Sequence, residues 1–383
     1  MYFCPKKSMK IQRNYQDLSN FIHPGKVLLI FGPRQVGKTT LMNEFLKTTT
    51  FKFKSVTGDD FGIHKVLSGQ NLQELKQFCE GYELLAIDEA QKIPQIGTTM
   101  KLIVDQMPEI RIIATGSSSF ELAGQTGEPL TGRKTTLMLH CISQMELLHH
   151  FNSFELKEKL NEFLIYGAYP AVVTAGTFAE KAAILNEISG AYLFKDIFAF
   201  ERLRNPQLLL DLLRLLAYQI GKEVSVNELS MNLSIDNKTV KRYLELLEKA
   251  FIITSLSGYS GNLRKEISKQ SKYYFYDIGI RNAVIANFNP PDLRNDKGQL
   301  WENFLVIERL KKQCYKPIYS NNFFWRSWSN KEVDFVEERE GKLFGYEFKF
   351  SKDQAKVPAL WLESYSQASF EVINRDNYLD FVS

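Results

Sequence analysis

Residues 26–40 read Lys26-Val-Leu-Leu-Ile-Phe-Gly-Pro-Arg-Gln-Val-Gly-Lys-Thr-Thr40, an apolar run followed by a turn with two glycines. Its apolar run predicts a buried strand, and a helix is predicted to begin at Lys38. Gly32, Gly37, Lys38 and Thr39 have the spacing of a phosphate-binding loop. Glycines let the backbone curl so that successive N–H groups point at phosphate oxygens, and the helix terminus adds partial positive charge. We expect Lys38 to reach the β- and γ-phosphates of a nucleotide and the Thr39 hydroxyl to ligate Mg²⁺.

A second motif, Leu84-Leu-Ala-Ile-Asp-Glu89, places two acids directly after a short apolar run. A buried strand delivers Asp88 to its carboxyl end, where it can hold Mg²⁺ through water, and Glu89 is placed to polarise the attacking water. This pair predicts ATP hydrolysis rather than nucleotide binding alone. The residues expected to bind ATP are Gly32, Pro33, Arg34, Gln35, Val36, Gly37, Lys38, Thr39 and Thr40.

Two further residues are candidates for contacts with the γ-phosphate. In P-loop ATPases with a catalytic glutamate, an extra strand lies between the strand of the phosphate loop and the acidic strand. The run Arg111–Thr115 fits that strand, so Ser117 at its polar tip is the candidate, with an ordinary turn as the alternative. Arg133 is a candidate arginine finger, with a solvated surface arginine as the alternative.

The remaining pattern predicts a chain of several parts. Apolar runs alternate with helical patterns up to about residue 150, which predicts a parallel sheet covered by helices on both faces. The middle of the chain is mostly helical, and the segment 287–296 is rich in Pro and Asn, which we interpret as a linker. We therefore expect three domains, at residues 1–150, 151–286 and 287–383.

A basic helical pattern lies in the middle part. Residues 225–233 and 237–250 have helical spacing around a polar turn, and two strand-like runs follow, flanking a Lys-rich loop. This order is typical of a winged helix. The basic residues expected to face solvent or phosphates are Lys238, Lys241, Arg242, Lys249, Lys265 and Lys269. DNA binding is one interpretation, and a winged helix used only for packing is the other.

A predicted hairpin near the carboxyl terminus gathers acids. If Glu340-Gly341 is its turn, Asp334 lies opposite Glu347, with Lys349 on the same face. Two close carboxylates favour a cation between them, either a second divalent metal (Mg²⁺ or Mn²⁺) or Lys349 itself. The pattern matches the PD-(D/E)XK nuclease signature, with Glu302 as an additional acid from a preceding helix. The alternative is an inactive relic that only binds DNA or a partner.

Composition and charge limit the classes of protein to which the chain can belong. With 44% apolar and 24% charged residues and a formal charge of +4, the chain has globular composition with a mild basic excess. The four cysteines form no CxxC pair, which fits a reducing compartment. No stretch approaches the roughly 18–20 apolar residues of a membrane span, so we expect a cytoplasmic protein that does not contact a membrane.

In this order, the motifs resemble those of a widespread bacterial and archaeal family of AAA-like ATPases with a C-terminal region of unknown function that has winged-helix and nuclease-like parts. The resemblance extends over nearly the whole chain. Its segments are Gly32–Thr40, Leu85–Lys92, Thr115–Ser118, Gly132-Arg133, Tyr166–Pro170, Lys272–Asp277, Gly298–Phe304, Lys331–Phe335 and Glu347–Lys349. It implies an α/β fold with an AAA+ type P-loop sheet, a helical and winged-helix module and a restriction-endonuclease-like domain, using ATP and Mg²⁺. Gln299 departs from the family's usual histidine.

These observations predict an ATPase whose nucleotide state controls how the C-terminal half binds or processes nucleic acid, with DNA as the expected partner. One alternative is a signalling switch that uses ATP to control self-association or assembly with a protein partner. Another is a transcription regulator that acts through the winged helix. In both alternatives the nuclease-like part is inactive.

Overall fold

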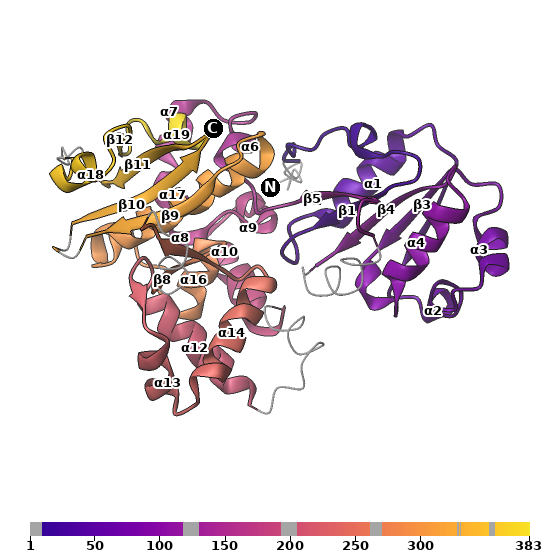
Figure 1. The fold of residues 1–383 in the computed structure, drawn as a ribbon, viewed down its shortest axis with the longest axis horizontal. Helices are drawn as coiled ribbons and strands as arrows, with labels where there is room; N and C mark the ends of the chain where they lie inside the picture. Colours follow the sequence, from indigo (N-terminus) through magenta and orange to yellow (C-terminus); the bar gives the residue numbers. More distant parts are fainter. Residues whose placement is uncertain are drawn as a thin grey trace, which may run out of the picture. The chain divides into compact units, whose positions relative to one another are not determined.

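The computed structural model describes residues 10–117, 130–192, 205–260, 270–327, 329, 331–351 and 357–383. The chain divides into two compact units (Figure 1). The first, here called the P-loop unit, comprises residues 12–141 together with 249–251. The second, the C-terminal unit, comprises residues 142–248 and 252–383, and also takes in the start of the chain. Residues 142–150 therefore group with the C-terminal unit, and the three-domain division with boundaries at 150 and 286 stays a prediction.

The P-loop unit is built on a parallel sheet. Its strands are β1 (Val27–Phe31), β2 (Phe53–Thr57), β3 (Leu84–Asp88), β4 (Arg111–Gly116) and β5 (Lys134–Met138). Their order is β2-β3-β4-β1-β5, and every pairing is parallel. The sequence prediction of a parallel sheet is confirmed, and so is the extra strand, β4, between the phosphate-loop strand β1 and the acidic strand β3.

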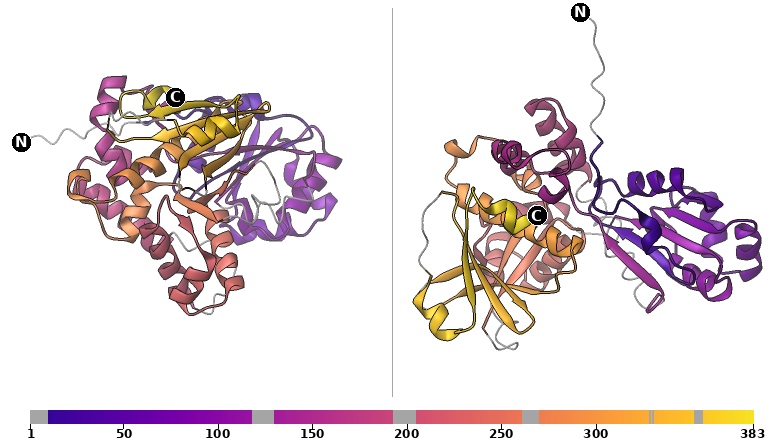
Figure 2. Two further views of the ribbon diagram at one scale, coloured as in Figure 1. Left: turned by 60° about the vertical axis from the view of Figure 1, so that its left-hand side comes forward. Right: turned by 90° about the horizontal axis from the view of Figure 1, so that it is seen from above.

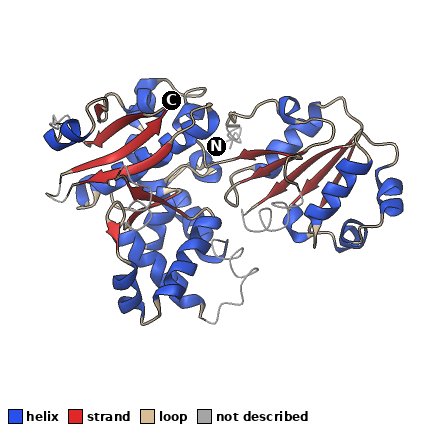
Figure 3. Ribbon diagram, in the orientation of Figure 1, coloured by secondary structure: helices blue, strands red, loops and turns tan. Residues whose placement is uncertain are grey.

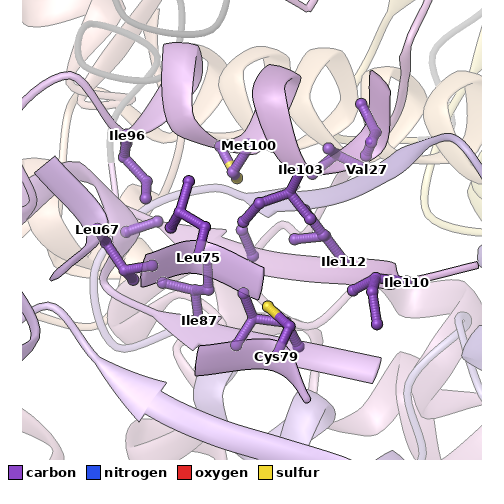
Figure 4. Packing of buried hydrophobic residues seen from close by; sticks show 14 of the residues in the cluster. Val27, Leu67, Leu75, Cys79, Ile87, Ile96, Met100, Ile103, Ile110 and Ile112 are labelled. Carbon is purple, nitrogen blue, oxygen red and sulfur yellow. The ribbon is translucent and has the colours of Figure 1, made fainter. Parts of the chain in front are cut away.

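Helices cover both faces of this sheet (Figure 3). They are η1 (Leu18–Phe21), α1 (Lys38–Thr48), α2 (Phe61–Ser68), α3 (Leu72–Cys79), η2 (Ala90–Lys92) and α4 (Ile96–Gln106). On one face, strand residues such as Val27 and Ile112 pack with Leu75 and Met100 from the helices in one buried cluster (Figure 4). Because successive strand side chains point to opposite faces, Leu28 and Ile113 point to the other face, where α1 contacts β4.

The C-terminal unit begins with a mainly helical segment. Its helices are α6 (Gln144–Leu147), α7 (Ser153–Glu158), α8 (Leu160–Tyr166), α9 (Pro170–Thr174), α10 (Phe178–Glu187), η3 (Ile188–Tyr192), α12 (Pro206–Tyr218), α13 (Val226–Leu233), α14 (Asn237–Lys249) and α16 (Ile278–Val284). Helix α10 continues into a π-helical turn at Ile188, and residues 193–204 lie outside the described part of the chain.

A seven-stranded sheet runs through this unit (Figure 2). Its strands are β6 (Glu223–Val224), β7 (Ile253–Gly258), β8 (Ser271–Phe275), β9 (Asn321–Arg326), β10 (Glu332–Arg339), β11 (Lys342–Phe348) and β12 (Ser369–Ile373). Their order is β12-β11-β10-β9-β7-β8-β6. The helices η4 (Pro291–Leu293), α17 (Lys297–Tyr315), α18 (Ala359–Ser364) and α19 (Tyr378–Val382) complete the unit.

The parallel pairing of β7 with β9 joins two parts that the sequence treats separately, because β7 follows the basic helices and β9 belongs to the carboxyl-terminal part. The segment 287–296, interpreted from composition as a linker, is packed rather than free. The guanidinium of Arg294 donates to Asp296 at 2.8 Å and to Asn282 at 3.0 Å, and its side chain is only 1% exposed.

Candidate functional site

The carboxyl ends of three neighbouring strands carry the predicted site residues of the P-loop unit. The phosphate loop follows β1, Asp88 and Glu89 end β3, and Ser117 follows β4. Because these strands are parallel and adjacent, all three ends lie along one edge of the sheet. Ligands of open α/β sheets bind at this edge.

The phosphate loop depends on glycine at two positions. Gly32 has φ 151°, and a Cβ atom there lies 2.0 Å from the carbonyl oxygen of Leu139, so no other residue fits without moving the backbone. Gly37 has φ 97° and precedes α1, which has no side-chain hydrogen bond capping its amino terminus. The first N–H groups of α1 are therefore left for a ligand such as a phosphate.

Lys38 is buried within the loop. Its ammonium donates to the carbonyl oxygens of Gly32 at 2.8 Å and Pro33 at 2.7 Å. These bonds hold the positive charge beside the curled backbone, where the sequence predicts the β- and γ-phosphates. Together with the uncapped helix, this arrangement fits a bound triphosphate.

The predicted magnesium ligands face each other. The Thr39 hydroxyl lies 2.9 and 3.0 Å from the two carboxylate oxygens of Asp88. The Thr115 hydroxyl also donates to Asp88 and accepts the backbone N–H of Glu89 at 3.0 Å. Within the described residues no group of three His, Cys, Asp or Glu side chains is arranged to hold a metal. That finding agrees with a P-loop site, where Mg²⁺ uses one or two protein oxygens plus phosphates and water.

Glu89 has an unusual backbone conformation and a fixed side chain. Its φ is 48°, in the left-handed region that few non-glycine residues occupy. Its carboxylate accepts the side-chain amide of Gln91 at 2.5 Å, and the same amide donates to the Ser117 hydroxyl at 3.1 Å. The structure therefore brings Glu89 and Ser117 together through Gln91, a residue to which the sequence analysis gave no role.

Arg13 is a second residue that sequence reasoning missed. Its guanidinium donates to the carbonyl oxygens of Val36, in the phosphate loop, at 2.5 Å and of His140 at 2.6 Å. These bonds tie the loop to the chain that follows β5. No local sequence motif indicates a role for Arg13, because its partners lie 23 and 127 residues away in the sequence.

Arg133 does not lie at the phosphate loop of its own chain. Its carbonyl accepts from the N–H of Val27, at the amino end of β1, and its guanidinium pairs with Asp105 in α4. The five residues of β1 separate this end from the loop by roughly 16 Å, at about 3.3 Å per residue. A contact with the γ-phosphate of the same chain is thus not seen, and the role of Arg133 as an arginine finger stays a prediction.

The carboxyl-terminal acids adopt the predicted hairpin. Glu340 and Gly341 both have positive φ at the turn, and the register runs from Arg339 opposite Lys342 to Phe335 opposite Tyr346. Asp334 precedes Phe335 and accepts the backbone N–H of Phe348 at 2.7 Å. This hairpin and α17 bring four of the predicted residues together. They are Glu302, Asp334, Glu347 and Lys349.

The cation among these acids differs from the expectation. Lys349 pairs with the outer acid Glu347, at 2.7 Å. Instead Lys272 of β8, which is 2% exposed, lies 3.0 Å from Glu302 and also pairs with Glu332. Burial lowers the pKa of Lys272, but the carboxylates of Glu302, Glu332 and Asp334 outweigh it and raise that pKa above its ordinary value.

Burial also changes the pKa of the buried carboxyl groups in this cluster. Burial and the neighbouring charges of Glu302 and Glu347 raise the pKa of Asp334 well above its usual range. Glu302 also accepts the Tyr274 hydroxyl at 2.6 Å. The Lys272 ammonium is the cation that pairs with carboxylates of this cluster, and a second divalent metal here stays a prediction.

The basic face of the middle segment is present in part. Lys238, Lys241, Arg242 and Lys249 are exposed on α14, while Val240 and Leu247 are buried on its opposite side. Lys265 and Lys269 lie outside the described residues.

Within the described ranges, no helix is both long and apolar enough to cross a membrane.

Family models match three stretches of the chain. Residues 24–148 match a family model described as an AAA domain. Residues 157–291 and 297–369 match two models described as domains of unknown function (DUF8612 and DUF4143). An uncharacterized protein of Mycobacterium tuberculosis is 26% identical over 337 residues, covering 87% of this chain and 72% of that protein. One from Haemophilus influenzae is 24% identical over 369 residues, covering 88% and 86%.

Among solved structures, the replication initiator DnaA bound to AMPPCP and single-stranded DNA matches with a TM-score of 0.26 and 14% identity, covering 62% of this chain and 93% of that one. A signal transduction ATPase with numerous domains from Pyrococcus horikoshii matches with a TM-score of 0.25 and 12% identity, covering 75% of this chain and 43% of that one. Residues 24–148 thus match an AAA-domain model, and within them the segment after β1 has the geometry of a phosphate-binding loop.

Proposed function

We propose that this protein binds ATP with Mg²⁺ at the phosphate loop and hydrolyses it. The observation that supports the proposal most directly is the Thr39–Asp88 pair, with Glu89 next in the chain. Thr39 and Asp88 would hold Mg²⁺, which would neutralise charge on the phosphates. Lys38 and the backbone N–H groups of the loop orient the triphosphate for attack.

In the proposed reaction, a water oxygen bonds to the γ-phosphorus and the bond from that phosphorus to the bridging β–γ oxygen breaks. The carboxylate of Glu89 accepts a proton from the water, and the electrons of the broken bond stay on the leaving phosphate of ADP. Charge that develops on the γ-phosphoryl oxygens is stabilised by Lys38 and by the amino terminus of α1. The products are ADP and inorganic phosphate.

Two variants test this proposal separately for binding and for chemistry. Lys38→Ala removes the buried ammonium and is expected to abolish both Mg-ATP binding by calorimetry and phosphate release. Glu89→Gln keeps the shape of the side chain but not its basicity, so binding should persist while turnover falls by roughly 100-fold or more. Lys76→Ala, at an exposed lysine on α3, is the control. Wild-type turnover by Lys38→Ala would rule the assignment out.

A second candidate function is that the C-terminal unit binds nucleic acid in a nucleotide-dependent way. The order α12, β6, α13, α14, β7, β8, with β8 pairing β6 and β7, supports a winged helix. The order α17, β9, β10, β11, α18, β12, with β12 parallel to β11, supports a restriction-endonuclease-like core. The exposed basic side of α14 supplies the phosphate-binding charge.

Binding of a labelled DNA duplex at several salt concentrations, with and without Mg-ATP, tests this second candidate. The double variant Lys238→Ala/Lys241→Ala should weaken binding and flatten the salt dependence by about two units of slope, since each phosphate contact contributes about one. Lys316→Ala, at another exposed lysine, should not. A change in oligomeric mass with ATP but no DNA binding would instead favour the switch that controls assembly.

A further inference from the structure

Gln91 lies at the centre of the proposed hydrolytic site without a role in the reaction as written above. It belongs to the short helix η2, which begins directly after Glu89, and its side chain is 5% exposed. Glutamine is seldom buried to this degree unless its polar atoms find partners. The partners that it finds are both predicted participants in the reaction.

The side-chain nitrogen of Gln91 joins the ends of two strands. It donates one hydrogen to Glu89 Oε2 at 2.5 Å and the other to Ser117 Oγ at 3.1 Å. An amide nitrogen has two hydrogens, so both bonds can form together. Gln91 therefore links the proposed base after β3 to the hydroxyl after β4, which is predicted to face the γ-phosphate.

The side-chain oxygen of Gln91 points to a functional rather than a stabilising role. This buried Oε1 accepts no hydrogen bond within the described part of the chain. Rotating the amide by half a turn does not help, because its oxygen would then face the carboxylate of Glu89. An unsatisfied buried acceptor costs about 1–3 kcal/mol, so stability alone does not explain a glutamine here.

We propose that Gln91 is a positioning residue for ATP hydrolysis, which holds the carboxylate of Glu89 in place and couples its orientation to Ser117. This inference rests on the proposed ATPase function. A glutamate side chain has three rotatable bonds, and a base acts only when it lies within hydrogen-bond reach of the water. A donor fixed at the same site edge keeps Glu89 in one orientation, and Ser117 makes that orientation sensitive to what occupies the γ-phosphate position.

The test separates kcat from nucleotide affinity. Gln91→Met keeps the length of the side chain and removes both hydrogen bonds. We expect kcat for Mg-ATP to fall about 10- to 100-fold, the scale of a mispositioned general base, while the Kd for Mg-ATP changes less than about threefold. The matched control is Gln73→Met, the same change at an exposed glutamine on α3. Thermal unfolding checks that each variant is folded.

A double-mutant cycle shows whether Gln91 acts through Glu89. In a Glu89→Gln background, adding Gln91→Met should lower the single-turnover rate no further, because the base is already lost. Ser117→Ala, which deletes only a hydroxyl, should lower kcat by a smaller factor and keeps the inference testable should Gln91→Met fail to fold.

Three results overturn the inference: unchanged kcat in Gln91→Met or Ser117→Ala, losses that multiply in the double variant, or a loss of ATP affinity equal to the loss of rate. Each of them leaves the ATPase proposal standing as long as the wild-type protein hydrolyses ATP. Absence of hydrolysis by the wild type sinks the ATPase proposal itself, and the role of Gln91 with it.

Discussion

The Thr39 hydroxyl and the carboxylate of Asp88 are within hydrogen-bond distance although 49 residues separate them in the chain. Thr39 lies in the first turn of α1 and Asp88 ends β3. Strand β4 separates β1 from β3 in the sheet, and the Thr115 hydroxyl at its end donates to Asp88 from the other side. The carboxylate is therefore held between two hydroxyl groups at the edge of the sheet.

Thr39→Ala should remove one proposed ligand of Mg²⁺. We expect the Mg²⁺ concentration needed for half-maximal ATP hydrolysis to rise by about tenfold or more, because the hydroxyl is one of few protein oxygens available to the metal. Thr39→Ser keeps the hydroxyl and should stay close to wild type. A Mg²⁺ titration of phosphate release checks this, and equal titrations of the Ala and Ser variants would contradict it.

Gly32→Ala should disrupt the phosphate loop. The added Cβ lies 2.0 Å from the Leu139 carbonyl oxygen, which is backbone and cannot rotate away. We expect ATP binding to fall below detection and the free energy of unfolding to fall by about 1–3 kcal/mol. Gly298→Ala, where nothing lies within 4 Å of the new atom, is the control and should leave both unchanged. Calorimetry and urea unfolding measure the two effects.

Lys272→Met should leave the buried carboxyl groups of Asp334 and Glu302 in the C-terminal unit without their cation. Breaking a buried ion pair by removing one partner costs about 3–5 kcal/mol. The pKa of Asp334 and that of Glu302 are already raised in the fold, so the carboxyl groups are tolerated when protonated and penalised when ionised. The loss should therefore be larger at pH 8 than at pH 5, by urea unfolding.

The same variant tests the nature of the cation site. If a divalent metal can take the place of the Lys272 ammonium among these acids, millimolar Mn²⁺ should raise the melting temperature of Lys272→Met by more than that of the wild type. Lys331→Met, at an exposed lysine beside β10, is the control. No response of Lys272→Met to Mn²⁺ would show that the cluster is only an ion-pair network.

Asp296 should give the C-terminal unit an acid-sensitive stability. Burial alone would raise the pKa of Asp296, but the hydrogen bond from Arg294 and the charge of Arg281 lower it to about 2. A lowered pKa stabilises the fold above the unfolded value near 4, and that contribution is lost as the pH falls towards 2. Asp296→Asn should cost about 1–2 kcal/mol at pH 7, allowing for partial exposure, and little at pH 2.5. Glu363→Gln, at an exposed acid, is the control for the urea titrations.

Much of this fold could be predicted from local sequence patterns, because the signals for these elements are short-range. The strand–loop–helix of the phosphate site and the hairpin around Glu340 follow from glycine conformation and hydrophobic spacing within about 20 residues. The register of that hairpin also follows from its turn, since a two-residue turn fixes every later pair. Composition misled at residues 287–296, because it does not show that the buried Arg294 side chain finds an ionic partner in Asp296.

Residue type and neighbours along the chain were enough to identify the residues that can bind a phosphate and the two acids that follow a strand. Which side chains meet became clear only from the folded chain. Gln91 reaches Ser117 and Arg13 reaches His140 because the sheet order brings their segments together. Lys272, rather than Lys349, lies beside Glu302 because β8 joins the same sheet as β10. Such contacts depend on strand order, which no local pattern encodes.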